Sequence, residues 1–297
     1  MNSKYPYIKK FSSDIGIPED ILVKAFEVET EFHFKIINEI DLEKRRELYR
    51  EVYNTVHSLY GRAKLPARQN PKINLVKKFG NAFDGKSIID VGCGNGDLLR
   101  AIRETGKPKR LVGVDVSEYV LSNSDPDIDF VKSDIIDFNL EDKFDFIFSD
   151  NVIEHIAPTD LESHLKSIKS ILKPDGKLII LMPNKLFGPS DVTRIFDYTY
   201  TNKIPAQGTH INETTYTEMI DVLKKHGFYK FKTIIPLPKI RSIFPGLRIN
   251  AKIVSFLEKN EWFIKLLYKF KYKGKCVLKL DIFLESTYYN NQPELCN

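Results

Sequence analysis

The sequence predicts an α/β fold in which a mostly parallel sheet carries helices on both faces. After residue 86, short runs rich in Ile, Val, Leu and Phe alternate with helical segments. Such runs are typical of strands buried on both faces and joined by right-handed βαβ connections. A glycine-rich turn follows the first of these strands. Apolar residues make up 42% of the chain and charged residues 29%, as in an ordinary globular protein with a sizeable core.

The first 80 residues are predicted to form a helical extension. Pro18 opens one candidate helix, and Asp41 is placed to cap the next. Apolar side chains recur in the second helix at helical spacing, namely Leu42, Leu48, Tyr49, Val52, Tyr53, Val56, Leu59 and Tyr60. We expect the helices of 1–80 to cover an edge or the mouth of the domain formed by 81–297.

Seven strands are expected in residues 81–297. Their sequences are SIIDVG, RLVGVDV, IDFVKSD, FDFIFSD, GKLIILMP, FYKFKTII and CVLKLDIFLES. Thr159 and Glu162 form a candidate capping box for the helix LESHLKSIKSIL, which Pro174 and Gly176 are expected to end. A further helix, YTEMIDVLKKHGF, is expected to stop at Gly227.

Targeting signals and charge limit the classes of function. The N-terminal residues lack the pattern of a secretory signal, no apolar stretch reaches the roughly 18 residues of a membrane span, and the three cysteines have no paired or metal-type spacing. We therefore expect a cytoplasmic protein. The net charge of +5 is local, because 239–275 holds ten Lys/Arg against two Glu. That segment carries +8 and the rest −3, so no general nucleic-acid-binding surface is expected.

The turn from Asp90 to Gly96 permits two cofactors. Its glycines let the backbone approach a ligand closely, and the next helix offers free N–H donors. A dinucleotide fingerprint, G-x-G-x-x-G, would require glycine where this chain has Asp97. The alternative pattern G-x-G-x-G is met by Gly92, Gly94 and Gly96, with Asp90 two positions upstream.

At this turn the chain resembles the class I S-adenosylmethionine-dependent methyltransferases, over roughly residues 85–235. Asp115 is suited to accept hydrogen bonds from both ribose hydroxyls, Asp134 resembles the acidic residue that meets the adenine amino group, and SDNVIEHI resembles the motif after the fourth strand. The resemblance implies a Rossmann-like seven-stranded sheet and S-adenosyl-L-methionine as cofactor. The implied cofactor-binding residues are Asp90, Gly92, Cys93, Gly94, Gly96, Asp115, Val116, Asp134, Ile135, Asp150 and Asn151.

Three side chains are candidates for catalysis. His155 and His210 should both lie near the carboxyl ends of parallel strands, where ligands bind in open α/β sheets, and Glu154 precedes the first of them. Histidine has a pKa suited to a general base near neutral pH. The Glu154–His155 pair is also similar to that of quinone-biosynthesis O-methyltransferases, which carry a further carboxylate where this chain has Asn151. We therefore predict no metal.

Acceptor recognition is expected in 185–212, an insertion after the fifth strand. It offers the polar and aromatic side chains of Asp191, Arg194, Asp197, Tyr198 and Tyr200. A small-molecule or glycan acceptor, methylated at oxygen, fits better than DNA, because no Asn/Asp-Pro-Pro-aromatic run follows the fourth strand. The alternatives are a catalytically inactive S-adenosylmethionine-binding partner protein and an NAD-dependent oxidoreductase.

The basic segment 239–275 has two interpretations. Within 249–272, apolar residues recur near one helical face with lysines between them, at Ile249, Ile253, Phe256 or Leu257, Ile264 and Leu267. A basic amphipathic helix can lie on an anionic membrane or meet a lipid-linked acceptor. The favoured interpretation is an insertion before the last strand that packs on the core.

Overall fold

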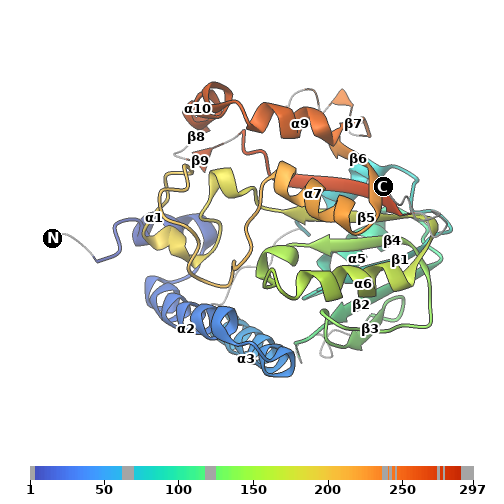
Figure 1. Cartoon of the computed structure of the whole chain (residues 1–297), viewed down its shortest axis with the longest axis horizontal. Helices are drawn as coiled ribbons and strands as arrows, with labels where there is room; N and C mark the ends of the chain where they lie inside the picture. Colours follow the sequence, from blue (N-terminus) through green and yellow to red (C-terminus); the bar gives the residue numbers. More distant parts are fainter. Residues whose placement is uncertain are drawn as a thin grey trace.

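The computed structural model describes residues 4–61, 70–117, 125–235, 240, 243–244, 246–272, 275–276 and 278–288. Its central feature is an eight-stranded sheet in the order β3-β2-β1-β4-β5-β10-β6-β7 (Figure 1). The strands are β1 (Ser87–Val91), β2 (Arg110–Asp115), β3 (Asp129–Lys132), β4 (Phe144–Asp150), β5 (Leu172–Met182), β6 (Phe228–Ile234), β7 (Arg248–Asn250) and β10 (Ile282–Tyr288). Strands β3, β2, β1, β4 and β5 run parallel, whereas β10, β6 and β7 join by antiparallel pairing.

The strand order reverses direction beside β1, since β2 and β3 lie on one side of it and β4 and β5 on the other. All five residues of β1 are buried. In open α/β sheets, ligands bind beyond the carboxyl ends of the strands at such a switch point. The turn from Asp90 to Gly96 lies at that end of β1.

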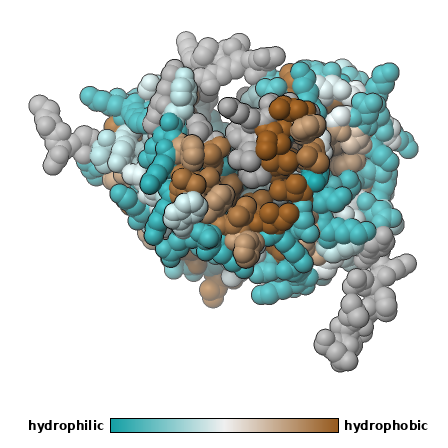
Figure 2. Space-filling view, turned by 90° about the horizontal axis from the view of Figure 1, so that it is seen from above, coloured by the Kyte–Doolittle hydropathy of each residue, from teal (hydrophilic) through white to brown (hydrophobic). Residues whose placement is uncertain are grey.

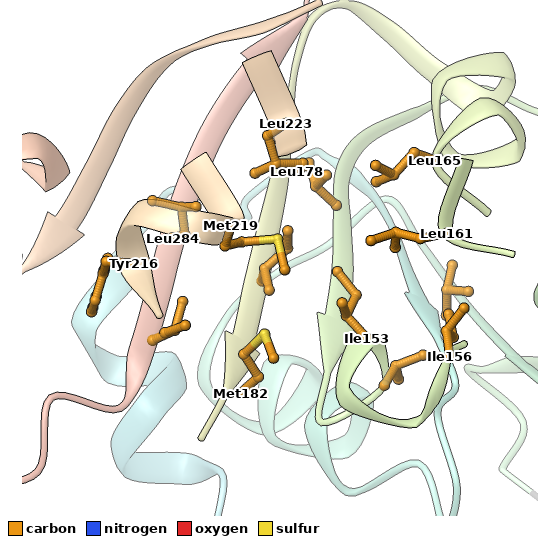
Figure 3. Packing of buried hydrophobic residues seen from close by; sticks show 14 of the residues in the cluster. Ile153, Ile156, Leu161, Leu165, Leu178, Met182, Tyr216, Met219, Leu223 and Leu284 are labelled. Atoms are coloured by element: carbon orange, nitrogen blue, oxygen red, sulfur yellow. The ribbon is translucent and has the colours of Figure 1, made fainter. Parts of the chain in front are cut away.

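Helices cover both faces of the sheet. One face carries α6 (Leu161–Ile171) and α7 (Tyr216–Lys225), and the opposite core contains α4 (Ile73–Val76) and α5 (Asp97–Thr105). In Figure 3, Leu161 and Leu165 of α6 and Met219 and Leu223 of α7 face the sheet. Their 3–4-residue spacing produces the apolar stripe that packs there.

Three helices precede the sheet, namely α1 (Ile8–Ile15), α2 (Glu19–Asn38) and α3 (Leu42–Gly61). Helices α2 and α3 lie side by side at the lower left of Figure 1. Pro18 occupies the N-cap position of α2, and the Lys44 amide donates to Asp41 Oδ1 at 3.1 Å at the start of α3. Both predicted helix starts are therefore confirmed.

The last strands differ from the predicted ones. An eighth strand, β7, lies in the basic segment, and β10 begins at Ile282 rather than at Cys276. Ile282 pairs with Met182, the last residue of β5, and Pro183 follows without an N–H to donate. The ladder therefore starts there, while Lys275–Cys276 (β9) pairs with Lys271–Tyr272 (β8) in a separate ribbon.

The predicted capping box at Thr159 is wrong. Helix α6 begins at Leu161 with Asp160 as N-cap and no side-chain cap bond, because the Asp160 carboxylate is bound to Arg45 of α3 instead. A complete capping box forms at the start of α7, where Thr215 and Glu218 bond to each other's backbone amides.

The basic segment forms two helices, α9 (Ala251–Glu258) and α10 (Glu261–Lys269), and not one continuous stripe. Asn260 caps α10 by accepting a bond from the Phe263 amide at 3.0 Å. The two helices lie at the top of Figure 1 beside β7. No helix in the described part of the chain has the length and apolar character needed to cross a membrane.

Candidate functional site

A cavity of about 240 Å³ opens at the switch point of the sheet. Eight of the residues predicted from the sequence line it, namely Gly92, Gly94, Asp115, Val116, Asp134, Ile135, Asn151 and His155. Helix α3 closes the cavity from the opposite side with Tyr49, Tyr53 and His57. The remaining wall is apolar and comes from Ile136, Val152 and Ile156.

The glycine turn is bonded to the neighbouring strand. Gly92 and Cys93 both donate their amides to Val114 O, at 2.7 and 3.0 Å. Gly92 has a φ of 82°, and a Cβ there would lie 2.4 Å from Val152 Cγ2. Only glycine satisfies both the left-handed backbone and this close approach.

Asp115 at the end of β2 is held in place by two backbone amides. Its Oδ2 accepts from the Gly94 amide and its Oδ1 from the Ser117 amide, both at 2.9 Å. Each oxygen keeps a further lone pair for a ligand hydroxyl. The carboxylate is thus oriented into the cavity before any ligand binds, as recognition of a vicinal diol requires.

Asp134 is already paired within the protein. Arg46 of α3 donates to its Oδ2, and the Ile136 amide donates to its Oδ1 at 2.7 Å. An amino group that approaches Asp134 would share this carboxylate with Arg46. The pair also ties α3 to the cavity wall.

Four of the predicted cofactor residues lie outside the cavity lining. Cys93 packs against Gly113 beneath the turn, Gly96 caps α5, and Asp150 lies 2.5 Å from Lys72 in an ion pair. Asp90 is buried, and its Oδ1 has no hydrogen-bond partner among the described residues. Burial and the nearby Asp150 raise the pKa of Asp90 well above its usual value. A ligand ammonium group would satisfy this oxygen, which fits the amino-acid end of S-adenosylmethionine.

The helices of 1–80 are expected from the sequence to cover an edge or the mouth of the domain, but the side chains that α3 contributes to the cavity are not predicted by it. Tyr49 and Tyr53 were identified only as members of an apolar stripe, and nothing distinguished His57. The docking of α3 depends on Asp160, which accepts from Arg45 Nε at 2.9 Å and from Tyr49 Oη at 3.1 Å. The helical spacing of the tyrosines was visible in the sequence, but not the surface that they would face.

Glu154, His155 and His210 meet beside the cavity. One ligand-type atom of each lies within 4.8 Å of the others, and the two imidazole rings pack edge to face with centroids 4.7 Å apart. His155 donates from Nδ1 to Thr209 O at 3.0 Å, since a carbonyl can only accept. Its Nε2 therefore carries the lone pair.

The protein environment separates the pKa values of these three groups. Burial, together with the charge of His210, lowers the pKa of His155 to about 3. Burial would also lower that of His210, but the hydrogen bond to Glu213 and the nearby Asp191 and Glu154 raise it to about 9. Burial raises the pKa of Glu154 to about 7, and neither of its carboxylate oxygens has a partner among the described residues.

Two imidazoles and a carboxylate are also a set that divalent cations accept. In this structure Glu213 Oε1 lies 2.8 Å from His210 Nδ1 and favours the charged form of the ring. An imidazolium has no lone pair for a metal, so a cation would have to displace that proton. The geometry is compatible with a metal, and the protonation state opposes it.

The insertion 185–212 separates into structural and cavity-facing residues. Two aspartates bond to backbone amides of the same segment. Asp191 accepts hydrogen bonds from the amides of Thr193 and Gly208. Asp197 accepts them from the amides of Thr199, Lys203 and Ile204. By contrast, Arg194, Tyr198 and Tyr200 line a second cavity, of about 710 Å³, which shares Asn151 with the first.

Comparison with known proteins identifies the family. A family model described as a methyltransferase domain matches residues 66–232. The chain is 27% identical over 206 residues to phosphoethanolamine N-methyltransferase 2 of Caenorhabditis elegans, covering 66% of this chain and 43% of that protein. It is 30% identical over 155 residues to ubiquinone biosynthesis O-methyltransferase of Actinobacillus pleuropneumoniae serotype 7, covering 48% and 64%.

The chain is also similar to proteins of solved structure. A putative S-adenosylmethionine-dependent methyltransferase from Listeria monocytogenes is 19% identical, with a TM-score of 0.46, and the match covers 74% of this chain and 98% of that one. The chain spans about two-fifths to two-thirds of the length of the first curated relatives. The family match covers more than half of the chain and contradicts the oxidoreductase alternative. The chain belongs to the methyltransferase-domain family.

Proposed function

We propose that this enzyme methylates an oxygen atom of a small-molecule or glycan acceptor, and that the Glu154–His155 pair accepts the hydroxyl proton. The observation that carries the proposal is the convergence of Glu154, His155 and His210 within 4.8 Å at the cavity wall. Among the relatives, the ubiquinone biosynthesis and malonyl-acyl-carrier protein enzymes carry the name O-methyltransferase, whereas the phosphoethanolamine enzyme is an N-methyltransferase.

S-adenosylmethionine supplies an electrophilic methyl group and its own leaving group, so the protein has to align the acceptor and remove its proton. His155 lines the cavity and keeps a neutral Nε2 at pH 7. Alone it is a weak base, because its pKa lies far below neutrality. The Glu154 carboxylate next to it has a pKa of about 7 and can stabilise the imidazolium that forms.

His210 has a supporting role in this scheme. It remains protonated near pH 7, because Glu213 bonds to its Nδ1. Its positive charge opposes the effect of burial on Glu154 and keeps part of that carboxylate ionised. The proton of the acceptor hydroxyl then moves to His155 Nε2, while Nδ1–H stays bonded to Thr209 O.

A pH profile of Glu154→Gln tests this assignment. In the wild type, kcat/KM should rise with pH through about 7 as Glu154 loses its proton. The amide variant should lose that limb and most of the turnover, while Glu162→Gln on the exposed side of α6 should behave as wild type. If the rise of kcat/KM with pH through about 7 persisted in Glu154→Gln, the proposed role of Glu154 beside His155 would be refuted.

Alanine variants of the two histidines test the rest of the site. His155→Ala and His210→Ala should abolish turnover while S-adenosylhomocysteine still binds, as measured by calorimetry. Turnover unchanged in both variants would exclude a histidine base. If the wild type bound S-adenosylhomocysteine but transferred no methyl group to a metabolite or glycan extract, the alternative of a catalytically inactive binding partner would be favoured.

We further propose that the N-terminal helices form a cap over the cofactor, with 81–297 as the methyltransferase domain. Helix α3 supplies Tyr49, Tyr53 and His57 to the cavity and is attached through two arginines, Arg45 and Arg46. This arrangement excludes water from one side of the cavity. We also propose that the enzyme acts in the cytoplasm.

We propose that the outer surface of α9 and α10 contacts an anionic lipid surface. The inner face packs on the core through Ala251, Val254, Ile264 and Leu267, as expected for an insertion. Nine of the twelve exposed large apolar residues in the described part of the chain lie in 240–272, namely Ile240, Ile243, Phe244, Leu247, Ile253, Phe256, Trp262, Phe270 and Tyr272. Figure 2 looks onto this side and shows apolar side chains gathered on it.

The charges on the same helices match an anionic bilayer. In 251–272 the exposed charged residues are Lys252, Lys259, Lys265, Lys269 and Lys271 against Glu261. Apolar insertion and lysine attraction act together at such surfaces. We expect the protein to bind phosphatidylglycerol-containing vesicles, and we expect salt to weaken this binding. The double variant Phe256→Ser with Trp262→Ser should also weaken it. The control Ile40→Ser should bind as wild type, because the Ile40 side chain is 94% exposed but lies outside α9 and α10. Equal sedimentation of all three proteins would exclude this contact.

A further inference from the structure

The second cavity contains a buried guanidinium for which the fold supplies no counter-charge. Arg194 belongs to the short helix η5 (Val192–Ile195) and is only 7% exposed. Its one hydrogen bond to a side chain is from Nη2 to Ser190 Oγ, at 3.4 Å. Within the described ranges of the chain, no carboxylate pairs with it. A buried charge is costly unless it is paired.

Two aromatic rings hold this guanidinium in place. The central carbon of Arg194 lies 4.4 Å from the ring centroid of Tyr200 and 5.2 Å from that of Tyr198. The Tyr198 hydroxyl in turn donates to Asp14 of α1 at 2.7 Å. Cation–π contacts offset part of the desolvation cost but use the faces of the group and leave its N–H donors available.

The walls around Arg194 are predominantly positive. Five cationic side chains line the cavity, namely Lys72, Lys78, Arg194, Lys275 and Lys279, against two acidic ones, Asp150 and Asp281. The lining thus has an excess of three positive charges. Three of the lysines form ion pairs, Lys72 with Asp150, Lys275 with Asp14 and Lys279 with Asp281. Among the described residues, Arg194 is therefore the most deeply buried cation whose charge no ion pair compensates.

The first cavity has the opposite character. Its charged lining residues are Asp115 and Asp134. The two cavities share Asn151, which follows β4 at the end of the sheet where the cofactor site lies. A molecule in the larger cavity therefore lies next to the cofactor site, between apolar side chains such as Phe11 and Met182 and the cationic wall.

We propose that the acceptor carries an anionic group, a carboxylate or a phosphate, that pairs with Arg194 in this second cavity. The planar guanidinium forms two parallel N–H···O bonds to either group, which a lysine cannot reproduce. The Tyr198 and Tyr200 rings pre-orient it. The inference rests on the proposed acceptor site but not on the identity of the atom that is methylated.

Calorimetry on the full chain saturated with S-adenosylhomocysteine tests this inference without turnover. Inorganic phosphate and succinate are the probes, and the one that binds more tightly identifies the anion. Arg194→Met should weaken binding of that probe at least tenfold, and Arg194→Lys should recover only part of it. The control Arg110→Gln removes an exposed arginine that pairs with Asp129 and Asp142, and it should bind as wild type.

Three results would overturn the inference. They are equal anion affinity in wild type and in Arg194→Met, no affinity of the wild type for either probe, and loss of S-adenosylhomocysteine affinity in Arg194→Met. The last would mean that the cofactor's own carboxylate is the partner. Arg194→Lys keeps the positive charge and serves as the second test variant if Arg194→Met does not fold. Methylation of nitrogen instead of oxygen would refute the proposed reaction and leave the anion site intact.

Discussion

Replacing Asp160 by asparagine should destabilise the protein strongly and loosen the helix that covers the cofactor cavity. Asp160 is 1% exposed and accepts two charged bonds from Arg45, at 2.5 Å from Nη2 and 2.9 Å from Nε. Tyr49 Oη adds a third bond at 3.1 Å. The amide keeps the shape of the side chain but leaves the Arg45 guanidinium buried without a counter-charge.

The expected cost follows from this burial. Breaking one partner of a buried ion pair costs about 3–5 kcal/mol. For a chain of this size each kcal/mol lowers the melting temperature by roughly 2–4 °C, so a fall of about 6–20 °C is expected. Since Tyr49 on the same helix lines the cavity, affinity for S-adenosylhomocysteine should fall as well.

Thermal and urea unfolding followed by circular dichroism measure this effect. The control is Asp142→Asn, because Asp142 pairs with Arg110 on the surface, where such pairs contribute about 0–1 kcal/mol. The double variant Arg45→Met with Asp160→Leu should recover much of the lost stability, since no charge remains buried. A destabilisation of Asp160→Asn no larger than that of Asp142→Asn would refute the reasoning.

Three further predictions concern the cofactor site. Gly92→Ala should abolish S-adenosylhomocysteine binding as measured by calorimetry, because the added Cβ would lie 2.4 Å from Val152. The control Gly80→Ala also places alanine at a positive φ, of 54°, but no atom lies within 4 Å of its Cβ, so it tests backbone strain without a clash. Equal affinity of the two variants for S-adenosylhomocysteine would contradict the clash. Asp115→Asn should weaken that binding at least tenfold through loss of an acceptor oxygen, so a change under twofold would count against its role. Turnover should persist in a chelator, whereas loss of activity restored by magnesium would show that Glu154, His155 and His210 bind a cation.

Local features of the fold were predictable because they depend on neighbours in sequence. The apolar runs predicted the parallel strands, and G-x-G-x-G predicted a turn whose three glycines all have positive φ. The start of β10 was not predictable in this way. It is set by the pairing of Ile282 with Met182, a hundred residues away along the chain.

The site shows the same division. Residue type, order along the chain and the family resemblance predicted Asp115, Asp134 and the Glu154–His155 pair, and Asp115, Asp134 and His155 line the cavity. Sequence alone could not show that His210 packs 4.7 Å from His155 or that Tyr53 of α3 faces the cavity. It also could not show that Arg194 is buried between two tyrosines with no carboxylate partner in the described structure.

The sequence by itself determined the fold class, because strand periodicity is a property of contiguous residues, and its resemblance to the class I methyltransferases implied the methyl donor. Only the tertiary structure decided which side chains meet at the proposed acceptor site and which charge each of them favours. Burial and the approach of distant groups set those charges, as in the pKa of about 7 for Glu154 and of about 9 for His210. Both effects depend on the packing of segments that lie far apart along the chain.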